Sequence, residues 1–367
     1  MKQSIVFSAN SSWYLYNFRR KTISAFLNLG YRVFCIAKRD DYTVKLSQLG
    51  AEFIDLNYSS HSKNPFSLLS QVLYMRRLLK QCKPIFLFNF KIKNNILGPI
   101  AALNLNIKVI NNISGLGTVF IRKSFVTSFV KLLYRFSNKY VKTIFCQNKD
   151  DFNFLLANHL ANKDQLELIP GSGVDLEKFH PRFRGQKQKD FIFIYLGRLI
   201  IDKGVIELLE AFKRLLPEFQ NTRLLIYGDY DSSNPRSIDP KIIELNKSNN
   251  YISFFDHTDE PKEILARVDC LVLPSYREGM PRSVLEASSM GIPCITSNVP
   301  GCRDAVIDGK TGLLCEPNNV NDLYIKMKQM RSMPRDSLTL MSNHARKHIE
   351  DNFSEHKAIK PYIDFLN

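Results

Sequence analysis

Residues 269–291 read DCLVLPSYREGMPRSVLEASSMG and contain one complete strand–loop–helix step. The apolar run at 269–273 predicts a buried strand, and the segment from Pro281 onward predicts a helix. Glu278 stands in the loop between them, whereas Glu286 stands inside the helix. Because ligands of parallel α/β sheets bind at the carboxyl ends of the strands, this loop is a candidate binding site.

The two glutamates allow different interpretations. Ser283 and Glu286 have the spacing of a helix capping box, Pro281 suits a first helical turn, and Gly291 could end the helix, which would make Glu286 a local fastener. Glu278 has no such local role. At a loop tip before a glycine, its carboxylate can accept hydrogen bonds from a polyhydroxy ligand, and the backbone N–H groups that follow can hold phosphate.

The same alternation of strands and amphipathic helices runs through the whole chain. It predicts the α/β class, with doubly wound parallel sheets. A polar stretch at 176–189 predicts a linker between a domain of residues 1–178 and one of residues 190–350. Helices are expected, for example, at 66–81 and 125–141. Strands are expected at 4–8, 31–37, 85–90, 107–111, 143–147, 190–196, 223–227, 251–255, 269–273 and 292–296.

Length and composition indicate an ordinary globular protein. The 367 residues exceed one typical core, and 44% hydrophobic with 23% charged residues gives no sign of disorder. The seven cysteines are scattered and contain no C-x-x-C pair, which favours a reducing compartment over disulfides or structural zinc. The first apolar stretch is too short for a signal peptide, and no run of about 18 apolar residues predicts a transmembrane helix.

The net charge of +16 is concentrated in the first half of the chain. Residues 1–180 hold 25 Lys and Arg against 10 Asp and Glu, and residues 56–149 hold 15 basic residues and no acidic one. Such a field predicts an anionic partner: phospholipid headgroups, a lipid diphosphate or nucleic acid. A basic surface that only confers solubility is the alternative.

A basic loop follows the strand at 190–196, in the stretch YLGRLIIDKGVIELLEAF. Arg198 and Lys203 flank a predicted helix N-terminus, which favours anions, and two cations beside it suit a diphosphate. An exposed basic turn is the alternative. The nearby Asp229-x-Asp231 pair is interpreted as turn-forming, and no metal or other cofactor is expected.

Together these loops resemble the family-4 retaining glycosyltransferases of GT-B fold, in which two Rossmann-like domains face each other across a cleft. EGMPRSVLE matches the E-x7-E motif of that family. Further similarity lies in IPGSGVDLEKFHP (169–181), GRLIIDKGV, VPGCRDAVIDGKTGLLCEP (299–317) and FSEHKAIKPYIDFL (353–366). The resemblance implies that the last segment, 351–367, is a helix that crosses back to the N-terminal domain.

The resemblance also implies roles for individual residues. Glu278 would bind hydroxyls of the donor sugar, Glu286 would bind the ribose of the nucleotide, and Arg198 with Lys203 would neutralise the donor diphosphate. Arg198, Lys203 and Glu278 are therefore the candidate catalytic residues. Pro281 stands where the family often has a glycine, and a proline cannot donate an N–H group. The remaining donor-binding candidates are Gly197, Gly279, Met280, Arg282 and Ser283.

The first half resembles a subgroup that extends undecaprenyl-diphosphate-linked sugars in surface-polysaccharide assembly, on YLYNFR (14–19), KIKNNILGPIAA (91–102) and NISGLGTVF (112–120). Ser114 stands where many members have His, so the role of that His does not transfer. Gly115 and Gly117 either bring the backbone close to the donor or are ordinary turn glycines. The candidates for the acceptor site or cleft are Arg19, Lys93, Asn95, Ser114, Gly115 and Gly117.

Residues 120–145 interleave basic and aromatic side chains at helical spacing. This pattern predicts an interfacial helix that rests on anionic lipid, and a packing helix with a solvated face is the alternative. The candidate membrane-surface residues are Arg122, Lys123, Lys131, Arg135 and Lys139. The protein is thus expected to be cytoplasmic and peripheral on the inner face of the cytoplasmic membrane.

The expected reaction transfers a hexose or N-acetylhexosamine, from a UDP-sugar, to a lipid-linked sugar with retention of configuration. A sugar-nucleotide epimerase of the same architecture is one alternative, which would turn over the donor without an acceptor. A basic nucleic-acid-binding protein is a weaker one, because no nucleic-acid-binding motif is present, and nucleic acid is not an expected partner. His344 and His348 have ligand spacing but suit an exposed helix better than a zinc site.

Overall fold

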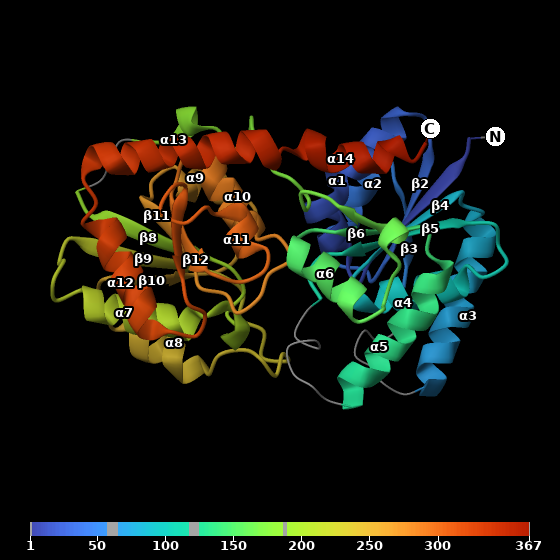
Figure 1. Cartoon of the computed structure of the whole chain (residues 1–367), viewed down its shortest axis with the longest axis horizontal. Helices are drawn as coiled ribbons and strands as arrows, with labels where there is room; N and C mark the ends of the chain where they lie inside the picture. The colour runs from blue at the N-terminus through green and yellow to red at the C-terminus, as the bar shows by residue number, and fades with distance from the viewer. Residues whose placement is uncertain (1, 57–64, 117–124, 186–188, 367) are drawn as a thin grey trace. The chain divides into compact units, whose positions relative to one another are not determined.

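A computed structural model describes residues 2–56, 65–116, 125–185 and 189–366 of the chain. The chain divides into two compact units (Figure 1). The N-terminal unit comprises residues 1–172 and 358–367, and the C-terminal unit comprises residues 173–357. The division falls inside the last helix, α14 (Glu355–Asp364).

The sheet of the N-terminal unit is parallel, with strand order β3-β2-β1-β4-β5-β6-β7. Apolar side chains on both faces of its central strands are buried, as expected when helices cover both faces of a sheet. The strands are β1 (Ser4–Ser8), β2 (Arg32–Ala37), β3 (Glu52–Asp55), β4 (Phe86–Phe90), β5 (Lys108–Ile113), β6 (Thr143–Cys146) and β7 (Leu166–Leu168).

A separate hydrophobic cluster lies on each face of this sheet. Ile5 and Phe7 belong to one cluster with side chains of α1, α2 and α14, whereas Val6 points the other way, into a cluster with side chains of α3, α4, α5 and α6. The period of two along β1 therefore places helices on both sides, which is the doubly wound arrangement. The helices are α1 (Ser12–Asn28), α2 (Thr43–Gln48), α3 (Pro65–Cys82), α4 (Ile92–Ala101), α5 (Phe125–Ser137) and α6 (Lys149–Ala157).

Buried asparagines connect the centre of this unit. Asn111 donates to the carbonyl of Asn95 at 2.8 Å and to the side chain of Asn138 at 3.2 Å, and Asn89 donates to Asn111 at 3.0 Å. The packing is tight, because a Cβ atom at Gly98 would lie 2.4 Å from Oδ1 of Asn89. Hydrogen bonding of this kind is what allows amide side chains to stay inside a core.

The C-terminal unit contains a second parallel sheet, of order β10-β9-β8-β11-β12-β13. This order reverses between β8 and β11, and the carboxyl ends of strands at such a switch point form ligand sites in Rossmann-type folds. The strands are β8 (Phe191–Leu196), β9 (Thr222–Tyr227), β10 (Ile252–Phe255), β11 (Cys270–Leu273), β12 (Cys294–Ser297) and β13 (Gly312–Cys315).

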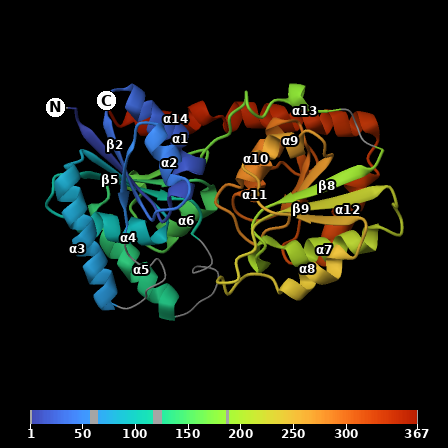
Figure 2. The same cartoon turned by 180° about the vertical axis from the view of Figure 1, so that it is seen from behind.

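The helices of the C-terminal unit enclose one continuous hydrophobic core. Helix α7 packs against α12, and α10 packs against α13 (Figure 2). Helix α7 shows why the sequence forms a helix here: its apolar residues recur at helical spacing, and six of them are buried in the core. The helices are α7 (Val205–Leu215), α8 (Pro240–Lys247), α9 (Pro261–Leu265), α10 (Arg282–Ser289), α11 (Cys302–Ala305), α12 (Val320–Arg331) and α13 (Arg335–Asn352).

Each strand predicted from the sequence is present to within two residues at its ends. The sequence did not predict β3, β7 and β13, which are strands of only three or four residues at sheet edges. The predicted helix at 125–141 ends earlier, at Ser137, and continues as a 3₁₀ turn at Asn138–Tyr140. The parallel α/β architecture itself is confirmed.

Candidate functional site

The connection from β8 to α7 carries the two predicted phosphate-binding cations. After β8 the chain continues through Gly197 and Arg198 to a 3₁₀ turn that ends at Lys203. Gly204 follows with a φ of +69°, and a Cβ atom there would lie 2.1 Å from the carbonyl oxygen of Pro274. Glycine therefore allows this loop to lie directly against the end of β11.

Lys203 and Glu278 meet as an ion pair at this point. The Lys203 ammonium contacts Oε1 of Glu278, and the hydroxyl of Ser275 donates to the same oxygen at 2.8 Å. The two charged side chains are only 19% and 12% exposed, so solvent and salt screen the pair less than a surface pair. One cation and one hydroxyl thus orient the predicted sugar-binding carboxylate.

A neighbouring ion pair holds the Lys203 turn in place. Nε of Arg236, in the loop after β9, donates to Oδ2 of Asp202 at 3.1 Å, and a second guanidinium nitrogen contacts the other carboxylate oxygen. The backbone N–H of Tyr276 donates to the Asp202 carbonyl at 2.9 Å. Because a two-pronged Arg–carboxylate contact fixes geometry as well as charge, three loops are joined around Lys203.

Glu286 is buried in α10 and is paired with Arg282. Nε of Arg282 donates to Oε1 of Glu286 at 2.7 Å, one helical turn apart. The capping-box interpretation of Ser283 and Glu286 is wrong, because Pro281 is the N-cap residue and Ser283 lies inside the first turn. Glu286 is therefore oriented by a cation and not by a helix cap.

Close backbone contacts complete this edge of the C-terminal unit. Gly301, with a φ of +77°, would place a Cβ atom 2.3 Å from the carbonyl oxygen of Gly279, and Gly228 would place one 1.9 Å from that of Gly197. The predicted Met280 is half-buried and packs against the hydrophobic core. Gly197 and Gly279 thus lie in loops that only small neighbours can approach.

Arg198, in the loop after β8, is exposed. Its carbonyl oxygen accepts a hydrogen bond from the buried Tyr195 hydroxyl at 2.8 Å, which anchors the backbone and leaves the guanidinium at the surface. The pKa of Asp231 lies below its usual value, chiefly because the Ser233 hydroxyl donates to it and to a lesser extent because of Arg198. Asp231 also accepts from the Ser233 N–H at 2.9 Å, as turn-forming aspartates do.

No arrangement for a metal ion is found in the part of the chain that the structure describes, where no three His, Cys, Asp or Glu side chains gather in one place. Asp229 lies 4.0 Å from Nδ1 of His257, and both side chains are largely exposed.

The acceptor-site candidates of the N-terminal unit lie in different surroundings. Arg19 is buried and donates to the Tyr362 hydroxyl at 3.1 Å, while Ser114 is half-buried at the end of β5. Asn95 is also buried, and it donates to the Asn112 carbonyl at 2.9 Å within the asparagine network. Arg19 and Asn95 are thus packed inside the unit, and Ser114 is the more accessible of the three.

The other three acceptor-site candidates are Lys93, Gly115 and Gly117. Lys93 is half-buried near the start of α4, and burial lowers the pKa of its ammonium. Gly115 has a φ of +96°, which a residue with a side chain rarely adopts. Gly117 lies outside the described residues.

On α5, two of the predicted membrane-surface cations bind to the protein itself. Lys131 donates to the Asn158 side chain at 2.7 Å, and Arg135 donates to the carbonyls of Asn158 and His159 at 3.1 and 3.2 Å. These carbonyls lie at the C-terminal end of α6, where cations are favoured. Lys139 is exposed, and Arg122 and Lys123 lie outside the described residues.

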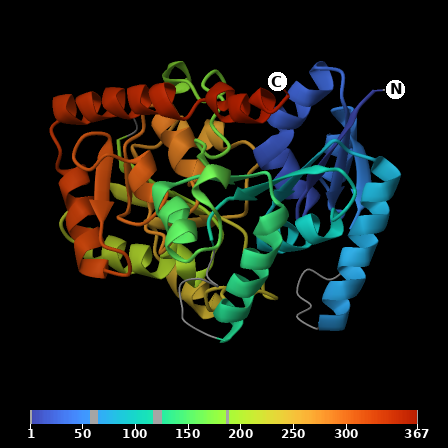
Figure 3. The ribbon, with the colours of Figure 1, turned by 45° about the vertical axis from the view of Figure 1, so that its right-hand side comes forward.

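The apolar stripe of α5 faces solvent. Three of its side chains, and Tyr140 in the 3₁₀ turn that follows it, are between 44% and 59% exposed, and α3 exposes two leucines to 58% and 59%. Helix α4 contacts both α3 and α5, and both helices extend in the same direction from the unit (Figure 3). We call these six residues the apolar face of α3 and α5: Leu69, Leu73, Phe129, Leu132, Phe136 and Tyr140.

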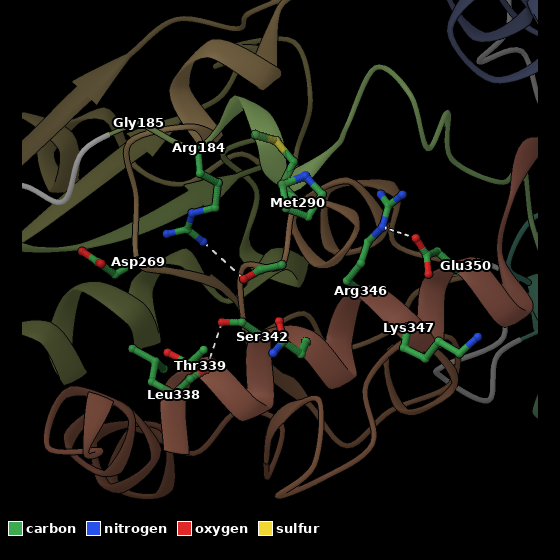
Figure 4. A pocket seen from close by; sticks show the side chains of 13 residues that line it. Arg184, Gly185, Asp269, Met290, Leu338, Thr339, Ser342, Arg346, Lys347 and Glu350 are labelled. Carbon is green, nitrogen blue, oxygen red and sulfur yellow. Dashed lines mark hydrogen bonds and ion pairs between the residues drawn. The ribbon is translucent and has the colours of Figure 1, made fainter. Parts of the chain in front are cut away.

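A hollow of about 400 Å³ lies at the amino end of β11, away from the loops described above. Its two arginines already bind other parts of the protein. Arg184 donates to the carbonyl of Val268 at 2.9 Å and to that of Gly291 at 3.2 Å, and Arg346 pairs with Glu350 at 2.6 Å. Figure 4 shows the contacts of Arg184 with Gly291 and of Arg346 with Glu350. The hollow is therefore not the site that the sequence predicts.

Comparison with known proteins identifies the family. Residues 177–348 match the family model described as Glycosyl transferases group 1, and residues 4–148 match Glycosyl transferase 4-like. The chain belongs to the glycosyltransferases. Together the two matches span most of both units of this glycosyltransferase, and they give no support to the epimerase alternative.

Two relatives and one solved structure show how far the similarity extends. The N,N'-diacetylbacillosaminyl-diphospho-undecaprenol alpha-1,3-N-acetylgalactosaminyltransferase of Campylobacter jejuni is 27% identical over 98% of both chains. The UDP-Gal:alpha-D-GlcNAc-diphosphoundecaprenol alpha-1,3-galactosyltransferase of Escherichia coli is 27% identical over 81% of this chain and 80% of its own. A glycosyltransferase of Rickettsia africae has a TM-score of 0.82 at 19% identity, over 99% and 97% of the two chains. The predicted GT-B fold is confirmed.

Sequence reasoning missed the residues that orient the predicted ones. Ser275, Asp202 and Arg236 were not among the predicted site residues. Ser275 orients Glu278, and the Asp202–Arg236 pair holds the turn that carries Lys203. Ser275 lies three residues before Glu278, a spacing that could have indicated a local contact. Arg236 lies 34 residues from Asp202, and no sequence signal connects them.

Proposed function

We propose that this glycosyltransferase moves a hexose or N-acetylhexosamine from a UDP-sugar to the sugar of a polyprenyl-diphosphate-linked acceptor, with retention of configuration, in surface-polysaccharide synthesis. The two relatives named above carry such acceptors in their names, and one carries UDP-Gal. The pairing of Lys203 with Glu278 at the end of β11 carries the proposal, because it puts the proposed phosphate-binding cation beside the proposed sugar-binding carboxylate.

In the proposed reaction, negative charge develops on the departing diphosphate. Arg198 and Lys203 neutralise that charge, and electrostatic stabilisation of this kind commonly contributes more to the rate of group transfer than any other effect. Arg198 is exposed, so its side chain can adjust to the bound donor. Lys203 is fixed by its ion pair with Glu278, and the Asp202–Arg236 pair holds the turn in which it lies. One cation is therefore pre-positioned and the other is adaptable.

The two glutamates bind opposite ends of the donor. Glu278 accepts hydrogen bonds from sugar hydroxyls, and the buried Glu286 accepts them from the ribose. Neither acts as a glycosidase-type nucleophile, a mechanism that needs two carboxyl groups about 5–5.5 Å apart around one bond. Arg282 balances the charge of Glu286 in the absence of ligand. Backbone N–H groups of Met280, Arg282 and Ser283 are the phosphate donors near Pro281.

The membrane would supply the acceptor. We propose that the apolar face of α3 and α5 rests in the interfacial region of the cytoplasmic membrane, with the surrounding basic residues on anionic headgroups. Each such cation contributes on the order of 1 kcal/mol near the surface. Lys131 and Arg135 mainly fasten α5 to α6, so the apolar side chains are the stronger determinants of binding. No helix in the described residues is long and apolar enough to cross a membrane.

The test is a donor screen. Purified protein is incubated with a panel of UDP-sugars and a synthetic polyprenyl-diphosphate sugar, and the lipid-linked product is separated from free sugar. The proposal predicts that at least one donor gives an extended lipid-linked saccharide. Turnover of a UDP-sugar to its epimer without acceptor would instead favour an isomerase.

A further inference from the structure

Tyr276 connects the loop that carries Glu278 to three other segments of the C-terminal unit. Its backbone N–H donates to the carbonyl of Asp202 at 2.9 Å, in the turn before α7. Its hydroxyl donates to Oε1 of Glu207, in the first turn of α7, at 2.5 Å. The hydroxyl also contacts Oδ1 of Asn318, in the loop after β13, at 3.1 Å. One residue therefore joins four segments, all within the same unit.

Glu207 relies on this phenol for its hydrogen bonding. The carboxylate oxygen Oε1 accepts the Tyr276 proton at a distance that is typical of charge-assisted hydrogen bonds. The other oxygen, Oε2, is buried and accepts no hydrogen bond from the residues that the structure describes. Burial, and after it the hydrogen bond to Glu207, raise the pKa of Tyr276, so the phenol keeps the proton that forms this bond. Because a buried carboxylate is costly without donors, the contact holds both side chains in place.

The stretch 274–280 has no regular secondary structure of its own. Its two ends are packed against glycines of neighbouring loops. Tyr276 lies between these ends, and the residues on either side of it are joined to each other, because the Ser275 hydroxyl donates to Oε1 of Glu278 at 2.8 Å. A displacement of Tyr276 therefore moves both the Glu278 carboxylate and the hydroxyl that orients it.

We propose that Tyr276, through its hydrogen bond to Glu207, is a positioning residue that fixes Glu278 against the donor sugar. This inference rests on the proposed function, in which Glu278 binds sugar hydroxyls. The contact proposed for the ribose is separate, because Glu286 lies in α10 and pairs with Arg282. Loss of the Tyr276 hydroxyl should therefore weaken the binding of the sugar and leave the binding of UDP intact.

The test compares binding of the nucleotide with binding of the sugar nucleotide. Calorimetry with the intact protein gives the Kd for UDP and for each UDP-sugar of the donor panel, and steady-state kinetics give kcat/KM for the donor that is transferred. Tyr276→Phe should keep the Kd for UDP within about twofold of the wild type and raise the Kd for the UDP-sugar about threefold or more. Its kcat/KM should fall about 10- to 100-fold, because misplaced groups lose rate steeply. A variant that had only lost stability would weaken both ligands alike.

Variants of Glu207 test the contact itself. Glu207→Gln keeps an oxygen that can accept the Tyr276 proton and should stay within about threefold of the wild-type kcat/KM. Glu207→Leu removes both acceptor oxygens and should be as slow as Tyr276→Phe. The double variant, Tyr276→Phe with Glu207→Leu, should be no slower than the slower single variant, because both changes remove one hydrogen bond.

Tyr324→Phe is the matched control. The Tyr324 hydroxyl, on α12, donates to Oε1 of Glu218, so the same unit contains a second phenol–carboxylate bond that is not part of the candidate site. Tyr324→Phe should keep the wild-type kcat/KM and both Kd values. If it were as slow as Tyr276→Phe, the loss would follow from any such bond and the positioning role would be overturned.

The two ligands also separate this inference from the proposed function. A Tyr276→Phe enzyme with kcat/KM within about threefold of the wild type would overturn the positioning role, as would equal weakening of UDP and UDP-sugar. A wild type that bound its UDP-sugar but formed no lipid-linked product would instead contradict the proposed acceptor, and the two Kd values would still decide the role of Tyr276. A wild type that bound no UDP-sugar would contradict the proposed donor, and this inference with it.

Discussion

Lys203 and Glu278, 75 residues apart in the chain, form one ion pair at the carboxyl edge of the C-terminal sheet. Ser275 donates to the same carboxylate oxygen, and Asp202, next to Lys203, is fixed by Arg236. Charge, hydrogen bonding and backbone packing therefore converge on a small group of side chains. The predictions below begin with this pair.

Removing either of the two cations that we propose to bind the donor diphosphate should slow transfer. Lys203→Met and Arg198→Met should each lower kcat by roughly 10²–10³, the effect of losing one oxyanion-stabilising group. Lys213→Met, which removes an exposed cation from the last turn of α7, is the matched control and should keep wild-type activity. Equal losses in all three variants would point to net charge as the cause.

Exchanging the charges of the Lys203–Glu278 pair separates stability from catalysis. Each single reversal, Lys203→Glu or Glu278→Lys, leaves two like charges in a poorly solvated position and should lower Tm. The double reversal rebuilds an ion pair and should recover most of that Tm, yet transfer should stay lost, because neither group then faces its part of the donor. Recovery of activity together with Tm would mean that the pair is only structural.

Gly204 should be far less tolerant than a glycine with the same backbone and open surroundings. Gly204→Ala must adopt a positive φ and place a methyl group against the Pro274 carbonyl, which together should cost about 2–5 kcal/mol. Gly309 has a φ of +71° with nothing within 4 Å of its Cβ position, so Gly309→Ala should cost only about 1–2 kcal/mol. Urea unfolding measures both, and similar losses would argue against the close loop contact.

The apolar face of α3 and α5 should govern membrane binding. Replacing Phe129, Leu132 and Phe136 by serine should reduce co-sedimentation with vesicles of anionic phospholipid by tenfold or more, since burial of each side chain contributes about 1.5–3 kcal/mol. Leu245→Ser is the control, because that leucine is 75% exposed on α8 of the other unit. Unchanged sedimentation of the triple variant would exclude this face.

The cysteines should be inert in the folded protein. All seven are buried, and burial raises the pKa of the Cys35 and Cys294 thiols to about 12 and that of Cys82 to about 11. Since the thiolate is the nucleophile that attacks a disulfide reagent, an aromatic disulfide at pH 8 should label none of the native cysteines and all seven after unfolding. Rapid labelling of one native cysteine would show that part of the core opens.

The sequence predicted the fold well where the local signal is strong. Buried strands such as Phe191–Leu196 are recognisable as short apolar runs, but Leu166–Leu168 is only three residues long, lies at a sheet edge and has no such signature. For the site, motif spacing and family resemblance named Glu278 and Lys203 without revealing that they touch. A contact between positions so far apart depends on strand order, which no local pattern contains.

The same limit explains two sets of contacts that the local pattern did not predict. Ser283 and Glu286 have the spacing of a capping box, but Pro281 already begins the helix, and Arg282 takes Glu286. Lys131 and Arg135 share a stripe with Lys139, but the end of α6 lies within their reach and offers carbonyl oxygens. In both cases the hydrogen-bond partner of the side chain depends on a neighbouring residue or segment that the local pattern does not include.

Analysis of the transfer product tests the central claim most directly. The protein is supplied with a UDP-sugar of α configuration and a polyprenyl-diphosphate sugar, and the anomeric configuration of the new linkage is read by NMR. We expect a lipid-linked product with an α linkage, formed by the wild type and not by Glu278→Ala. A β linkage, or an undiminished rate in Glu278→Ala, would contradict the proposed function.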